Sequence, residues 1–92
     1  MNGTYYRKYS DGFIIQGGYY YKGSSTKGTN TITFPIPFGN TLFTFSYDHV
    51  HNHAGVSNYY YGENVNVRTT NSVTFNFSND DWFGWTWTAT GY

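Results

Sequence analysis

In Phe83-Gly84-Trp85-Thr86-Trp87-Thr88-Ala89-Thr90, bulky apolar residues alternate with glycine and threonine. A period of two places successive side chains on opposite faces of an extended strand. Val73-Thr74-Phe75-Asn76-Phe77 repeats the pattern, and aromatic and β-branched residues are typical of strands. Both segments are therefore predicted to be strands that bury one face in a hydrophobic core.

Turn signals divide the rest of the chain into further strands. Asp11-Gly12 is typical of a tight hairpin turn, and Pro35-Ile36-Pro37 cannot continue a paired strand because proline has no backbone N–H. Seven short strands separated by turns predict a small antiparallel β-sandwich or barrel. The predicted strands are residues 4–9, 13–22, 30–34, 41–50, 58–68, 72–77 and 82–90.

The composition restricts how so small a domain is stabilised and what it binds. The chain has 92 residues, no cysteine, 24% aromatic and 11% charged residues, with five acids balancing five bases. Aromatic burial, sheet pairing or oligomerisation must stabilise it, because a short chain buries only about 60–65% of its unfolded surface. The few basic residues argue against nucleic acid as a partner. No apolar run reaches the ~20 residues of a membrane-spanning helix, so membrane insertion is not expected.

Successive antiparallel strands place alternate connections at the same end of a sandwich. This puts residues 23–29, 48–57 and 78–81 together at one end. Long loops on a rigid sheet often carry binding function. We therefore expect this end to hold the functional residues.

Four motifs follow one another along the chain: Gly12-Phe13-Ile14-Ile15-Gln16-Gly17-Gly18, Thr31-Ile32-Thr33-Phe34-Pro35-Ile36-Pro37-Phe38-Gly39-Asn40-Thr41, Thr69-Thr70-Asn71-Ser72-Val73-Thr74-Phe75 and Trp87-Thr88-Ala89-Thr90-Gly91-Tyr92. In this order and spacing they resemble the small C-terminal domain at the tips of bacteriophage tail fibres. The resemblance covers residues 11–92 and implies an antiparallel β-sandwich of six to seven strands that assembles as a parallel homotrimer. It also implies a virion component, made in the host cytoplasm and placed at the distal end of the fibre, where it recognises a bacterial surface receptor.

The first ten residues lie outside this resemblance. Residues 1–10 are expected to be either the end of a fibre shaft or a first edge strand, with the tip domain over residues 11–92. A strand arriving directly from a shaft would point the 48–57 loop toward the host. We favour this arrangement over a hairpin arm.

Three histidines share one parity with the aromatic residues of the strand before them. If the strand stayed extended, His49, His51 and His53 would form a row in line with Phe43-Thr44-Phe45-Ser46-Tyr47. In a parallel trimer that row would converge on the three-fold axis, where imidazoles could ligate a divalent metal ion. The alternatives are solvated or hydrogen-bonded imidazoles in a polar loop, and contacts to a sugar.

Tyrosines 59–61 divide between the two faces of their strand. Parity groups Tyr59 and Tyr61 with Val65 and Val67, which assigns these two tyrosines to the core or to a subunit interface. Tyr60 has the opposite parity, so its ring is the one expected to be available for other contacts. An exposed tyrosine could pack across strands or stack on the apolar face of a pyranose.

The remaining candidate receptor contacts are polar groups beside these rings. Asp80 precedes Trp82, whose parity opposes the core face of its strand, so a carboxylate and a ring could hold one sugar. A plain turn is the alternative interpretation of this segment. Asn52 and Asn58 complete the candidate receptor-binding set with Tyr60.

We therefore expect a non-enzymatic receptor-binding tip that attaches to bacterial lipopolysaccharide or to an outer-membrane protein. Asp80 and Asp81 are poor glycosidase partners in a turn, and there is no serine–histidine–acid motif or glycine-rich phosphate loop. The first alternative is a structural module that trimerises and caps the fibre without contacting a receptor. A monomeric lectin is the second alternative.

Overall fold

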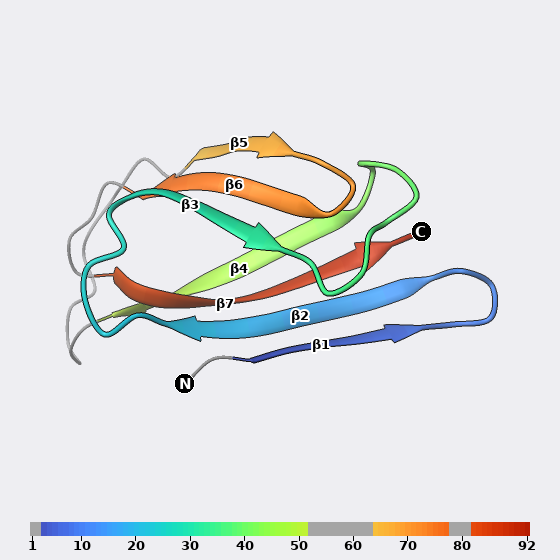
Figure 1. Ribbon diagram of the computed structural model, residues 1–92, viewed down its shortest axis with the longest axis horizontal. Coiled ribbons are helices and arrows are strands. Elements are labelled where there is room, and N and C mark those ends of the chain that lie inside the picture. The colour runs from blue at the N-terminus through green and yellow to red at the C-terminus, as the bar shows by residue number, and fades with distance from the viewer. Residues whose placement is uncertain (1–2, 52–63, 78–81) are drawn as a thin grey trace.

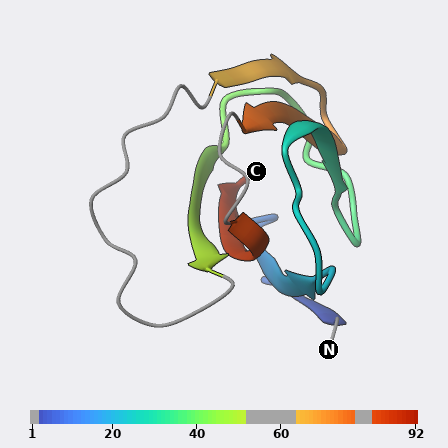
Figure 2. The same cartoon turned by 90° about the vertical axis from the view of Figure 1, so that its left-hand side faces the viewer.

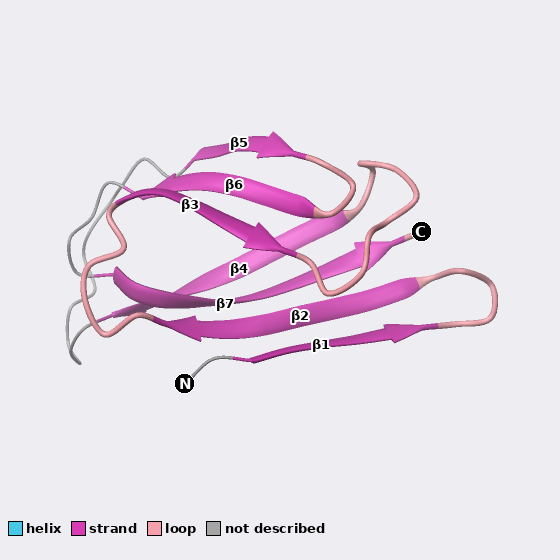
Figure 3. Cartoon of the chain, in the orientation of Figure 1, coloured by secondary structure: helices cyan, strands magenta, loops and turns pink. Residues whose placement is uncertain are grey.

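The computed structural model describes residues 3–51, 64–77 and 82–92, which form seven strands and no helix (Figures 1 and 3). The described ranges therefore hold no helix that could span a membrane. The strands are β1 (Gly3–Lys8), β2 (Ile14–Tyr21), β3 (Gly28–Thr33), β4 (Thr44–His51), β5 (Asn64–Arg68), β6 (Ser72–Phe77) and β7 (Trp82–Gly91).

The strands form two antiparallel sheets that pack face to face. One sheet has the order β1-β2-β7-β4 and the other has the order β3-β6-β5. Figure 2 shows the four-stranded sheet curving beneath the smaller one, with edge strands β1 and β3 on the same side of the sandwich. The prediction of an all-β antiparallel sandwich is confirmed.

The alternating segments bury the faces that their pattern predicts. Trp85, Trp87 and Ala89 of β7 and Val73 and Phe75 of β6 are all at least 95% buried. Full burial of a valine or phenylalanine side chain, as at Val73 and Phe75, stabilises the fold by about 1.5–3 kcal/mol. The rest of the buried apolar cluster consists of Ile14, Ile32, Phe34, Phe38 and Phe43.

Gln16 hydrogen-bonds the connection that contains Pro35 and Pro37 to the four-stranded sheet. Its side chain is fully buried in β2, donates from Nε2 to the carbonyl oxygen of Ile36 at 2.9 Å, and accepts from the Ile36 N–H at 3.1 Å. Because the two prolines beside Ile36 cannot join a sheet ladder, this amide replaces a strand partner. The connection is thus held over the core without being part of a sheet.

The end of the chain packs against two of the motif segments. The Gly39 N–H donates to the carbonyl oxygen of Tyr92 at 2.7 Å, and the Tyr92 ring meets Phe13 edge-on at 5.3 Å. Arg68 donates to the carbonyl oxygens of Thr41 (3.1 Å) and Phe43 (2.7 Å), and its guanidinium lies 4.4 Å from the centre of the Phe43 ring. These contacts close the end of the sandwich opposite the histidine-bearing end.

The expectation that residues 4–9 arrive directly from a shaft is wrong. Residues Gly3–Lys8 pair antiparallel with β2, with Gly3 opposite Tyr19 and Lys8 opposite Ile14. This segment is a hairpin arm and an edge strand, because the turn at Gly12 returns the chain along itself. Gly3 therefore lies toward the same end as His51, the last residue of β4.

The expected alternation fails in β5. Parity predicts Val67 on the core face, yet 53% of its surface is exposed. The register of β5 against β6 shifts between Val65 and Val67, and an extra residue in a strand moves the following side chains to the other face. The shift lies beyond Val65, which pairs with the buried Phe75, so it does not affect the grouping of Tyr59 and Tyr61 with Val65, and their assignment stays a prediction. Both tyrosines lie outside the described residues.

Candidate functional site

Strand ends that carry the predicted functional connections meet at one end of the sandwich. Tyr21 of β2 and Val50 of β4 both lie opposite Gly84 of β7, so the two strands finish at the same level. Figure 1 shows the end of β2 and the beginning of β3 at this same end. The described strand ends that lead into these connections therefore lie at one end of the sandwich, as the sequence predicts.

The histidine row is interrupted at the level of the backbone. His49 lies opposite Trp85 and His51 lies opposite Trp82, because the register of β4 against β7 shifts between Val50 and His51. Within residues 3–51, 64–77 and 82–92, no three histidine, cysteine, aspartate or glutamate side chains gather as a metal site. His53 lies outside those ranges, so the metal site on a trimer axis stays a prediction.

Most of the predicted receptor contacts also fall outside the described part of the chain. Only the backbone of Trp82 is described, at the start of β7. The other predicted contacts, outside the described residues, are Asn52, Asn58, Tyr60 and Asp80.

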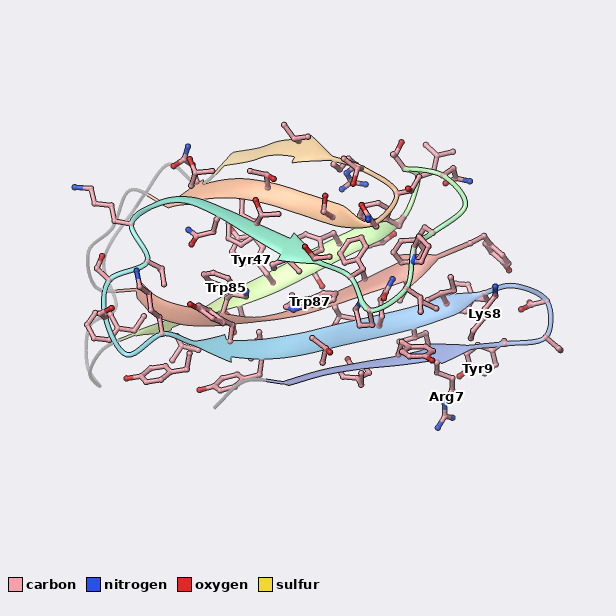
Figure 4. All side chains as sticks on the ribbon, viewed as in Figure 1. Arg7, Lys8, Tyr9, Tyr47, Trp85 and Trp87 are labelled. Atoms are coloured by element: carbon pink, nitrogen blue, oxygen red, sulfur yellow. The ribbon has the colours of Figure 1, made fainter. Side chains whose placement is uncertain are left out.

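The outer face of the four-stranded sheet brings together residues from three strands that are distant in sequence. Tyr5 lies opposite Gly17, which lies opposite Thr88, and residues directly opposite in antiparallel strands share a face. Arg7 has the parity of Tyr5 and projects away from the sandwich in Figure 4. Tyr5, Tyr19 and the β7 threonines with this parity therefore face outward.

A trough runs across this outer face. Its volume is about 580 Å³, and it is lined by residues of β1, β2 and β7 that include Tyr5, Tyr19, Thr86 and Thr88. The Tyr5 ring lies over Gly17, since a Cβ there would come within 2.7 Å of Cζ of Tyr5. Tyr5 is nevertheless 53% exposed. The trough thus combines aromatic rings with threonine hydroxyl groups.

A crevice adjoins the trough on the inner side of β1. Its volume is about 320 Å³, and it lies between the start of β1, the end of β2 and edge strand β3. Gly3, Thr4, Tyr19 and Trp87 line both hollows, so the two meet at the beginning of β1. β1 and β3 are not hydrogen-bonded to each other, which leaves this side of the sandwich open.

Residues 8–92 match the family described as tail fiber protein gp53-like, C-terminal. The chain belongs to this family. A search of curated proteins gave no match. The resemblance to a tail fibre domain that the motifs predicted is confirmed.

Two solved tail fibre structures share the fold of this gp53-like domain. One is the N-truncated R2-type pyocin tail fibre, with a TM-score of 0.66 and 20% sequence identity. The other is the R2 pyocin fibre of P. aeruginosa, residues 323–691, with a TM-score of 0.68 and 18% identity. All of this chain is covered in both comparisons, and it spans 38% and 26% of those chains.

Sequence reasoning missed the trough of the gp53-like domain entirely. Tyr5, Tyr19 and Thr86 come together only because β2 lies between β1 and β7 in the sheet. The available signal was Gly17-Gly18 inside a predicted strand, because glycine in a strand often marks the close approach of another group. That signal would have pointed to a ring folded over β2.

Proposed function

We propose that this gp53-like domain is a receptor-binding part of a phage-type tail fibre, attaching the particle to a bacterial surface glycan or protein without catalysis. The main support for this proposal is the trough on the outer face of the four-stranded sheet. It is wide enough for an extended chain of sugars or a peptide, since ligand sites usually have volumes of ~300–1,000 Å³. Its position on a rigid sheet rather than on a loop keeps the contact residues fixed.

The chemistry of the trough favours a glycan over a purely apolar partner. A tyrosine ring packs against the apolar face of a pyranose, and its hydroxyl group can bond outward. Tyr19 of β2 lies opposite Thr86 of β7, so a ring and a hydroxyl group stand side by side. Such pairs can hold both the C–H face and the hydroxyl groups of one sugar. Lipopolysaccharide is therefore the first receptor to test, and an outer-membrane protein is the second.

We further propose that the domain acts as a parallel homotrimer at the distal end of its fibre. Three copies would present three troughs, and linked weak sites gain avidity without any new contact. The large share of aromatic residues, 24% of the chain, is consistent with extra burial between subunits. A divalent metal ion held on the three-fold axis by His49, His51 and His53 is part of the same proposal.

Binding of the fluorescently labelled chain to Gram-negative cells and to their purified lipopolysaccharides tests the function. We expect saturable binding by the wild type and at least a tenfold loss for Thr86→Tyr, which fills the trough with a ring in addition to those of Tyr5 and Tyr19. Thr29→Tyr is the matched control, because Thr29 is an exposed β3 threonine that lines neither hollow. A trimer that binds no cell would instead favour a capping module, whereas a 10.6 kDa monomer in sedimentation would contradict the trimer.

A further inference from the structure

The crevice between β1 and β3 holds a buried hydrogen-bond donor without an acceptor. Trp87 is 5% exposed, and no described residue accepts a hydrogen bond from its indole N–H. A Cβ on Gly18 would meet Nε1 at 2.7 Å and Cγ2 of Thr4 at 3.0 Å, so the N–H edge reaches across β2 toward β1. Trp87 and Thr4 both line the crevice. Buried donors are normally paired, so this one is available to a ligand.

The opposite wall of the crevice offers an acceptor. Asn30 of β3 uses both hydrogens of its amide, donating to the carbonyl oxygens of Thr26 at 2.8 Å and Gly28 at 3.1 Å. These two bonds fix the orientation of the amide and identify its oxygen, Oδ1, as the remaining polar atom. No described residue donates to Oδ1. A ligand hydroxyl group can therefore donate here.

Aromatic rings and the edge strand β3 complete the lining. Tyr20 and Trp85 pack together with ring centres 4.7 Å apart, and both line the crevice. Thr31 and Thr33 line it from β3, and Thr31 bonds to Thr74 at 3.0 Å. The volume of about 320 Å³ suits one sugar ring rather than a longer chain.

We propose that this crevice is a second binding site, which takes a single hexopyranose unit of the receptor glycan. The hydroxyl groups of the sugar would accept from the Trp87 N–H and donate to Asn30 Oδ1, while the rings cover its apolar face. Because the crevice meets the trough at the beginning of β1, a branch of a glycan lying in the trough can enter it. The biological role of this site rests on the proposed function, but its sugar binding does not.

Titration followed by NMR tests the site directly. The indole N–H resonance of Trp87 is recorded in the ¹⁵N-labelled chain during addition of D-glucose, D-galactose, D-mannose or N-acetyl-D-glucosamine. We expect a saturable shift with at least one sugar, half-complete at about 1–10 mM, as suits a small ligand in an open site. A Trp87 resonance that none of the four sugars moves would overturn the proposal.

Two matched variants locate the binding. Thr33→Tyr places a ring at the mouth of the crevice and should weaken sugar binding at least tenfold. Thr29→Tyr changes an exposed residue with the same parity on the same strand, outside the crevice, and should bind like the wild type. Equal sugar binding by Thr33→Tyr and the wild type would overturn the assignment of the site.

Cell binding separates this proposal from the proposed function. If the wild type binds host cells and Thr33→Tyr binds them equally well, the crevice has no part in receptor recognition, and this inference fails while the adhesive function stands. If the Trp87 resonance responds to sugar but no cell is bound, the crevice site holds and the adhesive function fails.

Discussion

Replacing Gln16 by methionine removes the amide that fastens the Pro35–Pro37 connection while keeping a side chain of similar shape. Two hydrogen bonds to Ile36 are lost, at 2.9 and 3.1 Å, and each such bond contributes about 0.5–1.5 kcal/mol net. The two Ile36 groups then lie unpaired, at about 1–3 kcal/mol each when water cannot reach them. Because Ile36 is only half-buried, we expect the total loss near the lower end, about 2–4 kcal/mol.

Thermal unfolding followed by far-UV circular dichroism measures this loss. Domains of this size have a total stability of roughly 5–15 kcal/mol, and 1 kcal/mol moves the midpoint by about 4–8 °C. Gln16→Met should therefore melt roughly 8–30 °C below the wild type at equal protein concentration. The exposed Thr29→Ala is the control and should change stability by less than about 0.5 kcal/mol. A Gln16→Met midpoint within 2 °C of the wild type would refute the proposed role of the amide.

Three further predictions follow from single contacts. Arg68→Lys should destabilise the chain by about 1–3 kcal/mol, because a lysine cannot bond to two carbonyl oxygens while stacking on the Phe43 ring. Unfolding in urea measures this loss, and a variant as stable as the wild type would contradict it. Gly84→Ala should lower the free energy of unfolding by at least about 2 kcal/mol or prevent folding, since its Cβ would collide with the Tyr20 carbonyl oxygen. An unchanged melting curve would contradict the close packing of β2 against Gly84. If His49 helps to hold a metal on a trimer axis, elemental analysis should find a divalent ion in a fixed ratio to the trimer, and a chelator should lower the melting midpoint. A metal-free trimer whose melting midpoint does not change with chelator would contradict this metal site.

Local patterns were sufficient to predict the architecture. The alternation around Trp85 and Trp87 identified a core face because the period of two is imposed by strand geometry alone. Asp11-Gly12 marked a tight turn, because such a turn depends on few residues, although the favoured expectation that residues 4–9 arrive directly from a shaft was wrong. Neither inference needed knowledge of which strands are neighbours.

Long-range pairing explains what the sequence could not provide. Tyr5 and Tyr6 are adjacent and both more than half exposed, so β1 has no alternating apolar face that would decide between an edge strand and the end of a shaft. The shifts of register near Val67 and Val50 depend on the partner strands. The hydrogen bonds of Gln16 to Ile36 span twenty positions, beyond the reach of any local pattern.

The most direct test of the adhesive role compares two neighbouring tyrosines on opposite faces of β1. Tyr5 lines the trough, and Tyr6 lines neither the trough nor the crevice, although their exposed fractions are nearly equal at 53% and 56%. Binding of Tyr5→Ala and Tyr6→Ala to the same host cells should differ, with at least a tenfold loss for Tyr5→Ala and wild-type binding for Tyr6→Ala. Equal binding of both variants would contradict recognition of the receptor through the trough.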